Sequence, residues 1–346
     1  MLSDPCPRKL QRRAGSRLRT GERGESGYPA HVEFVPPAPG LENAAVPIWP
    51  QRTACERGLN PGLSERGTAT YHPGMRLVDS HCHLNAERFA GDEQAVLDRA
   101  RTAGVERILV PGWNLASSTR ALQLVDRFEW LDASVGVHPH DAAKVDEAGW
   151  REIVAMAADP RVVAIGETGL DYDRVFSPIP DQLTNLRRNL DLALETGKPA
   201  IVHVRSKAGL ADAQDSTLSE LGAAGFGSQR SAAVFGDRPP AVIHSFSGSV
   251  DYARRILDLG LAISISGLAF RAGEEATADV IALVPAERLL VETDAPFLSP
   301  PGAPKGRNEP EYVRITAEWA ASRGAETQDG FGEGLVQAYG RVFGKP

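Results

Sequence analysis

The sequence predicts an α/β protein folded as a (β/α)8 TIM barrel. From Arg76 onward, short runs of β-branched and apolar residues alternate with amphipathic segments, as expected of repeated strand–helix units. No Gly-rich phosphate loop follows the first run, although an open doubly wound sheet would more often carry one there. A closed barrel is therefore favoured, with eight strands at Val78, Ile108–Val110, Ala133–Val137, Val162–Ile165, Ala200–Val204, Ala241–Ile243, Leu261–Ile265 and Leu289–Val291.

The segments between these strands are predicted to be amphipathic helices. The clearest are Glu93–Ala103, Ser117–Phe128, Trp150–Ala157, Gln182–Thr196 and Tyr252–Leu259. A barrel of this class takes about 250 residues. The chain has 346 residues, of which 42% are hydrophobic, so we expect one catalytic domain, at 75–346, plus extra length.

Residues 1–74 differ in composition from the rest of the chain. They are rich in Arg, Pro and Gly and show neither strand nor helix periodicity, which predicts a disordered or irregular N-terminal extension. Acidic residues interrupt the Arg-rich start and no apolar run of signal-peptide length follows, so a targeting peptide is disfavoured. Met75 immediately precedes the first strand, and the extension could therefore be an artefact of start-site assignment.

Charge and cysteine content limit the function classes. A net charge of −7 argues against a constitutively basic nucleic-acid surface, but not against a nucleic-acid substrate, because bound divalent cations would add local positive charge. Only three cysteines occur, and two of them lie in the N-terminal extension, so no disulfide framework is indicated. We expect a reducing, cytoplasmic location, no membrane association, and a monomer as the simplest oligomeric state.

Metal-binding side chains stand where the predicted strands end. Histidine nitrogen and carboxylate oxygen are ligands of Zn, Mn and Mg, and a carboxylate can bridge two cations whereas a neutral imidazole cannot. Glu167 is therefore the candidate bridge. Alternate residues of an extended segment share one side, so His81 and His83 can face the same ion. The predicted metal ligands are His81, His83, Glu167, His203, His244 and Asp294.

Each of these residues also has a purely structural interpretation. A single histidine at a strand end is most often a hydrogen-bonded core or rim residue. Glu167 could form an ion pair with Arg205, and Asp294 could cap a helix beginning at Ala295 and Pro296. The recurrence of such side chains at equivalent strand ends favours a metal site over these separate explanations.

Six short motifs occur in order at or near the ends of the predicted strands. They are Asp79-Ser80-His81-Cys82-His83-Leu84, Gly136-Val137-His138-Pro139-His140, Gly166-Glu167-Thr168-Gly169-Leu170-Asp171-Tyr172, His203-Val204-Arg205, His244-Ser245-Phe246-Ser247-Gly248 and Glu292-Thr293-Asp294-Ala295-Pro296. Together they resemble the motifs of the TatD family of metal-dependent deoxyribonucleases. The resemblance implies hydrolysis of DNA phosphodiester bonds, in single strands or at ends. It also implies one ion among His81, His83, Glu167 and Asp294, and a second among Glu167, His203 and His244.

This interpretation implies roles for further residues. Two divalent cations (Mg, Mn or Zn) would activate a water, with Glu167 and Asp294 as catalytic residues and Asp294 as the base. Arg205 lies two residues after His203 and suits a substrate phosphate. The predicted substrate contacts are Arg205, His138, His140, Tyr172 and Arg307. For Tyr172 two roles are open, stacking on a base or packing beneath Glu167. Asn308 is predicted to be structural.

Two departures from the family pattern stand out. Ser206 follows Arg205, where the family commonly has an acidic residue. Residues 222–240 form a long Gly-, Ser- and Pro-rich connection without a helical pattern, and this connection could reshape substrate access. The main alternative is amide or ester hydrolysis on the same barrel, including deacylation of D-aminoacyl-tRNA. Non-enzymatic binding of nucleic acid or a partner is disfavoured because the ligand set is complete. A fourth strand ending in Glu167 also separates this chain from amidohydrolases bridged by a modified lysine.

Overall fold

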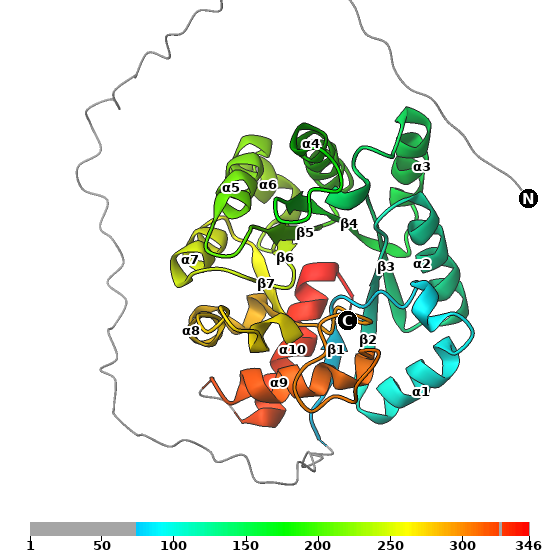
Figure 1. Cartoon of the computed structure of the whole chain (residues 1–346), viewed down its shortest axis with the longest axis vertical. Helices are drawn as coiled ribbons and strands as arrows, with labels where there is room; N and C mark the ends of the chain where they lie inside the picture. The colour runs from blue at the N-terminus through cyan, green and yellow to red at the C-terminus, as the bar shows by residue number, and fades with distance from the viewer. Residues whose placement is uncertain (1–73, 325–326, 346) are drawn as a thin grey trace, which may run out of the picture. The chain divides into compact units, whose positions relative to one another are not determined.

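The computed structural model describes residues 74–324 and 327–345, and it shows a barrel of parallel strands surrounded by helices (Figure 1). The predicted fold class is confirmed. The prediction for the N-terminal extension lies outside the described residues, except for Gly74. The eight strands pair in sequence order and are β1 Leu77–Asp79, β2 Val105–Pro111, β3 Leu131–Val135, β4 Val162–Asp171, β5 Ala200–Arg205, β6 Ala241–Ile243, β7 Ala262–Ile265 and β8 Leu289–Val291.

The barrel closes between β8 and β1 through the residues that follow each strand. The amide of Ser80 donates to the carbonyl of Val291 (3.1 Å), and Cys82 forms a parallel bridge with Ala295. The segments that carry the first and last predicted ligands are thereby held together, which a flat open sheet would not achieve.

Helices cover the outside of the barrel between successive strands (Figure 1). The five predicted helices are present, and each has at least one end displaced by one to three residues. No helix among the described residues is long and apolar enough to cross a membrane. The helices are α1 Glu93–Thr102, α2 Leu115–Arg127, α3 Glu147–Ala157, α4 Ile179–Thr196, α5 Asp212–Ala224, α6 Gln229–Phe235, α7 Val250–Asp258, α8 Thr277–Leu283, α9 Val313–Ala321 and α10 Gln328–Phe343.

The connection at residues 222–240 differs from its prediction, because it contains the end of α5 and the whole of a short helix, α6. Ser228 caps this helix, and Phe226 and Phe235 bury their rings at its two ends. A helix of two turns is too short to show a periodic pattern in the sequence. Arg238 donates to the carbonyl of Gly197, just ahead of β5, so the connection lies at the amino-terminal end of the strands. It does not line the pocket described below, and the expected effect on substrate access is wrong.

Candidate metal centre and substrate pocket

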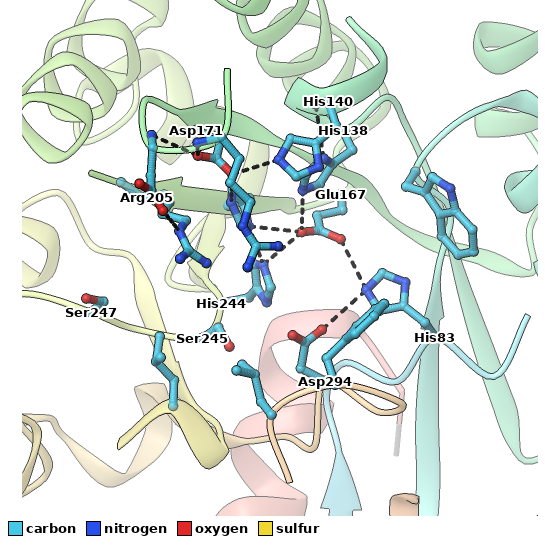
Figure 2. A pocket seen from close by; sticks show the side chains of 18 of the residues that line it. His83, His138, His140, Glu167, Asp171, Arg205, His244, Ser245, Ser247 and Asp294 are labelled. Carbon is cyan, nitrogen blue, oxygen red and sulfur yellow. Dashed lines mark hydrogen bonds and ion pairs between the residues drawn. The ribbon is translucent and has the colours of Figure 1, made fainter. Parts of the chain in front are cut away.

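A cavity of about 700 Å³ opens at the carboxyl ends of the strands. This volume lies within the range of about 300–1,000 Å³ that is typical of ligand sites. His81 is fully buried at its base. The other five predicted metal ligands line it, namely His83, Glu167, His203, His244 and Asp294 (Figure 2).

Glu167 occupies an irregular part of β4, where the pairing register with β5 shifts between Ile165 and Thr168. Gly166 precedes it with φ of +131°, and a Cβ there would lie 2.6 Å from the carbonyl oxygen of Ile201. Only glycine permits both this backbone conformation and this approach to β5. The glycine therefore allows the Glu167 carboxylate, which is 2% exposed, to reach the centre of the pocket floor.

The two carboxylate oxygens of Glu167 face different imidazoles. Oε1 lies 2.9 Å from Nε2 of His244, 3.3 Å from Nδ1 of His203 and 3.3 Å from Nε2 of His138. Oε2 lies 3.3 Å from Nε2 of His81 and 3.5 Å from Nε2 of His83. One carboxylate thus joins two groups of nitrogen donors.

Asp294 completes the group around Oε2. Its Oδ1 lies 3.3 Å from Nε2 of His83 and 3.7 Å from Nε2 of His81. Asp294 adopts a left-handed backbone conformation with φ of +52°, and its amide donates to the carbonyl of His81 (2.9 Å). Its side chain therefore points at the histidine pair and does not cap a helix.

The buried charges at this centre interact strongly. Burial alone would raise the pKa of Glu167, but the surrounding histidines, led by His138 and His244, outweigh burial and hold that pKa well below its usual range. Burial lowers the pKa of His81, with His244 as a further cause. A lowered pKa favours the ionised carboxylate, which is the form that can bind cations.

Sequence reasoning missed two buried carboxylates behind the histidines. Oε1 of Glu292 lies 3.2 Å from Nδ1 of His244 and accepts the amide of Ser245 (2.7 Å). Oδ2 of Asp171 lies 2.7 Å from Nε2 of His140 and 3.6 Å from Nε2 of His203. Carboxylates in such positions fix the tautomer and orientation of metal-binding histidines.

The segment after β8 is fixed by Asp79 and Asn308. Asp79 accepts the amide (2.9 Å) and the hydroxyl (2.6 Å) of Thr293. Asn308 donates to the carbonyls of Thr293 (2.9 Å) and Phe297 (2.6 Å). Asn308 is structural, and these four bonds hold the main chain on both sides of Asp294.

The predicted substrate contacts fall into two sets. His138, His140 and Arg205 line the pocket. Arg205 pairs through Nε with Oδ2 of Asp173 (2.8 Å) and not with Glu167. Oγ of Ser206 accepts the amide of Ala213 at the start of α5 (2.9 Å).

Tyr172 and Arg307 do not line the pocket. Tyr172 packs against the core, since the residue before it, Asp171, faces the pocket and successive residues of a strand face opposite sides. Arg307 binds Asp92 and Glu309, both at 2.7 Å, and is therefore engaged in holding the loop after β8 against α1. Neither residue therefore lines the cavity in which a substrate is expected to bind.

The donor set fits metal ions. Nε2 of His81 and Nε2 of His83 lie 3.2 Å apart, and two such nitrogens repel unless a proton or cation lies between them. Among the described residues, the buried Oε2 of Glu167, Nδ1 of His81 and Nε2 of His203 have no hydrogen-bond partner. Buried polar atoms are rarely left unpaired, and divalent cations would satisfy Oε2 of Glu167 and the paired nitrogens.

Comparisons with known proteins agree with this geometry. The chain is 38% identical to the 3'-5' ssDNA/RNA exonuclease TatD of Klebsiella pneumoniae, over 73% of the chain and 92% of the relative. It is 36% identical to the metal-dependent hydrolase YabD of Bacillus subtilis, over 71% and 90%. The crystal structure of YJJV, a TatD homologue from Escherichia coli K12, superposes with a TM-score of 0.69 at 30% identity, covering 79% of this chain and 99% of that one. The TatD related DNase profile matches residues 78–344, and the chain belongs to this family.

Proposed function

We propose that this chain is a metal-dependent hydrolase that cleaves phosphodiester bonds of single-stranded nucleic acid, with DNA as the main substrate. The observation that carries the proposal is Glu167, whose two oxygens face two separate groups of imidazoles. A buried carboxylate in this arrangement suits a bridge between two cations. The relatives named as ssDNA/RNA exonucleases support the choice of substrate.

Two divalent ions are assigned to the two groups of donors. The first would take His81, His83, Glu167 and Asp294, and the second Glu167, His203 and His244. His138 lies as close to Oε1 of Glu167 as His203 does, so we include it as a donor to the second ion, in place of the substrate contact expected from the sequence. This many imidazoles favours Zn or Mn over Mg.

When bound, the cations supply a water of lowered pKa and neutralise charge that develops on the phosphate. The residues of the chain position the reactants. Asp294 is partly exposed to the pocket, with 14% of its side chain accessible, and can accept the proton of the attacking water. Arg205, oriented by Asp173, presents its outer nitrogens to a phosphate oxygen. Every assigned residue comes from one chain, so a monomer suffices.

The test uses metal-stripped protein with Mg, Mn or Zn restored separately. Its substrates are a single-stranded oligonucleotide, the matching duplex, a D-aminoacyl-tRNA and an aryl ester. We expect cleavage of the single strand that depends on added metal and is lost in Glu167→Gln. Glu220→Gln, a change on the outside of the barrel where Glu220 pairs with Arg187, is the control and should retain activity. Hydrolysis of the ester or the aminoacyl-tRNA without cleavage of any oligonucleotide would overturn the assignment.

A further inference from the structure

The two sides of the pocket differ in chemistry. Figure 2 shows His83 and Arg205 on opposite sides of Glu167. On the first side, the ring of His83 meets two aromatic rings edge-on, with centroids 5.1 Å from Trp113 and 5.9 Å from Phe297. Both aromatic residues line the cavity. The metal donors are therefore bordered by an aromatic wall on this side.

The aromatic side chains are presented on a fixed main chain. Phe297 is 52% exposed, yet its amide donates to the carbonyl of Asp294 (2.9 Å) and its carbonyl accepts from Asn308 (2.6 Å). The amide of Trp113 donates to Oγ of Ser117 (2.8 Å), and its carbonyl accepts the amide of His138 (2.9 Å). Because the main chain is already fixed, only the side-chain torsions of these two residues have to be ordered when a flat partner binds.

Guanidinium groups lie on the other side, where Asp173 orients one of them by pairing with Nε of Arg205 (2.8 Å) and Glu274 also lines the cavity. Among the described residues that line the cavity, the only lysine or arginine side chains are Arg174 and Arg205. Arg174 follows β4 and Arg205 ends β5, whereas Trp113 follows β2 and Phe297 follows β8. A strand of nucleic acid carries a charge on every phosphate but has neutral bases. The charged part of the strand is thus favoured beside the arginines, and an uncharged flat group beside the aromatic residues.

We propose that Trp113 and Phe297 form a stacking site for the terminal base of a single strand, while the rest of the strand leaves the pocket past Arg174 and Arg205. The inference rests on the proposed function and adds to it an orientation of the substrate. Stacking tolerates any base because each has a π face, so the site would accept all four terminal bases. A base inside a duplex is already stacked and paired, so duplex ends would be cleaved more slowly.

The experiment compares three oligonucleotides of one sequence: an unmodified strand, one with an abasic nucleotide at its 3′ end, and one with an abasic nucleotide at its 5′ end. The wild-type protein with added Mn should prefer the unmodified strand to one abasic strand by at least about fivefold in kcat/KM, from the usual strength of stacking on an aromatic side chain. Phe297→Ala and Phe297→Leu should lose this preference, so that the ratio of kcat/KM between the two strands falls to about one. Phe297→Tyr should keep it.

Phe297→Leu separates stacking from apolar contact, because leucine keeps an apolar side chain but has no π face. Val154→Ala, which removes an exposed apolar side chain (38% exposed) from α3, is the control and should behave as wild type. An equal loss on the unmodified and abasic strands, or no loss in Phe297→Ala, would overturn the stacking site while leaving the nuclease assignment intact. Failure of the wild-type protein to cleave any of the strands would overturn both.

Discussion

Glu292 offers a direct test of the metal centre, because its carboxylate can be neutralised without a change of shape. We consider Glu292→Gln. The remaining amide oxygen can still accept from Ser245 and His244, which contact Oε1 at 2.7 and 3.2 Å. The new amide nitrogen would take the place of Oε2, 3.5 Å from the hydroxyl of Ser80, which can act as an acceptor. We therefore expect this variant to fold.

The loss should appear in metal affinity. The carboxylate behind a metal-binding histidine raises the basicity of the ligand nitrogen, and removing such a partner typically weakens metal binding by about 10–100-fold. This corresponds to about 1.4–2.8 kcal/mol of binding free energy. Because Glu292 is fully buried, solvent does not screen its charge, and the full range applies.

The assay is isothermal titration of Mn or Zn into metal-stripped protein. Glu220→Gln is again the control, because its carboxylate is also largely buried, at 13% exposure, but pairs with Arg187 away from the pocket. We expect the dissociation constant to rise in Glu292→Gln and to stay at the wild-type value in Glu220→Gln. An unchanged constant in Glu292→Gln would refute the idea that this carboxylate supports a metal-binding His244. An equal rise in both variants would show only a general effect of charge.

Three further predictions follow from the geometry. Metal at about 100 times its dissociation constant should stabilise the fold by about 2.7 kcal/mol. This should raise the melting temperature by about 5–10 °C, and calorimetry should find that Glu167→Gln loses the increase. Asn308→Ala leaves the carbonyls of Thr293 and Phe297 unpaired, so denaturant unfolding should show that the free energy of unfolding falls by about 1–3 kcal/mol. The kcat should also fall, because Asp294 loses its position. Arg307→Ala should lower stability without raising KM for an oligonucleotide, since Arg307 lies outside the pocket; a raised KM would restore the phosphate contact expected from the sequence.

The barrel and the ring of strand-end ligands were predictable because both depend on short-range patterns. Alternation along an extended segment puts His81 and His83 on one side, and the order of strands in a parallel barrel brings the strand ends together. The structure places the other five predicted ligands around Glu167, four histidines in contact with its carboxylate and Asp294 beside His83, as these rules require.

The residues that sequence reasoning missed depend on contacts between distant segments. Glu292 reaches His244 from β8 across β7 to the end of β6, and no sequence spacing signals that pairing. Its position in the same motif as Asp294 was the available clue. The ion pair of Arg307 with Asp92 was unpredictable for the same reason, because Asp92 lies more than two hundred positions earlier in the chain.

The proposed metal donors and the residues proposed to meet the rest of the substrate lie on different parts of the fold. The metal donors lie on or directly after strands whose main chains are tied to one another around the barrel, so their positions tolerate little change. Trp113, Arg174 and Phe297 stand on the connections after β2, β4 and β8, where a different residue type could replace each of them without disturbing the pairing of the strands. A chain with the same donors but different residues at these three positions would keep its metal affinity and select another substrate. If the proposed roles hold, the metal ligands determine the reaction, and the loop residues select which phosphodiester reaches them.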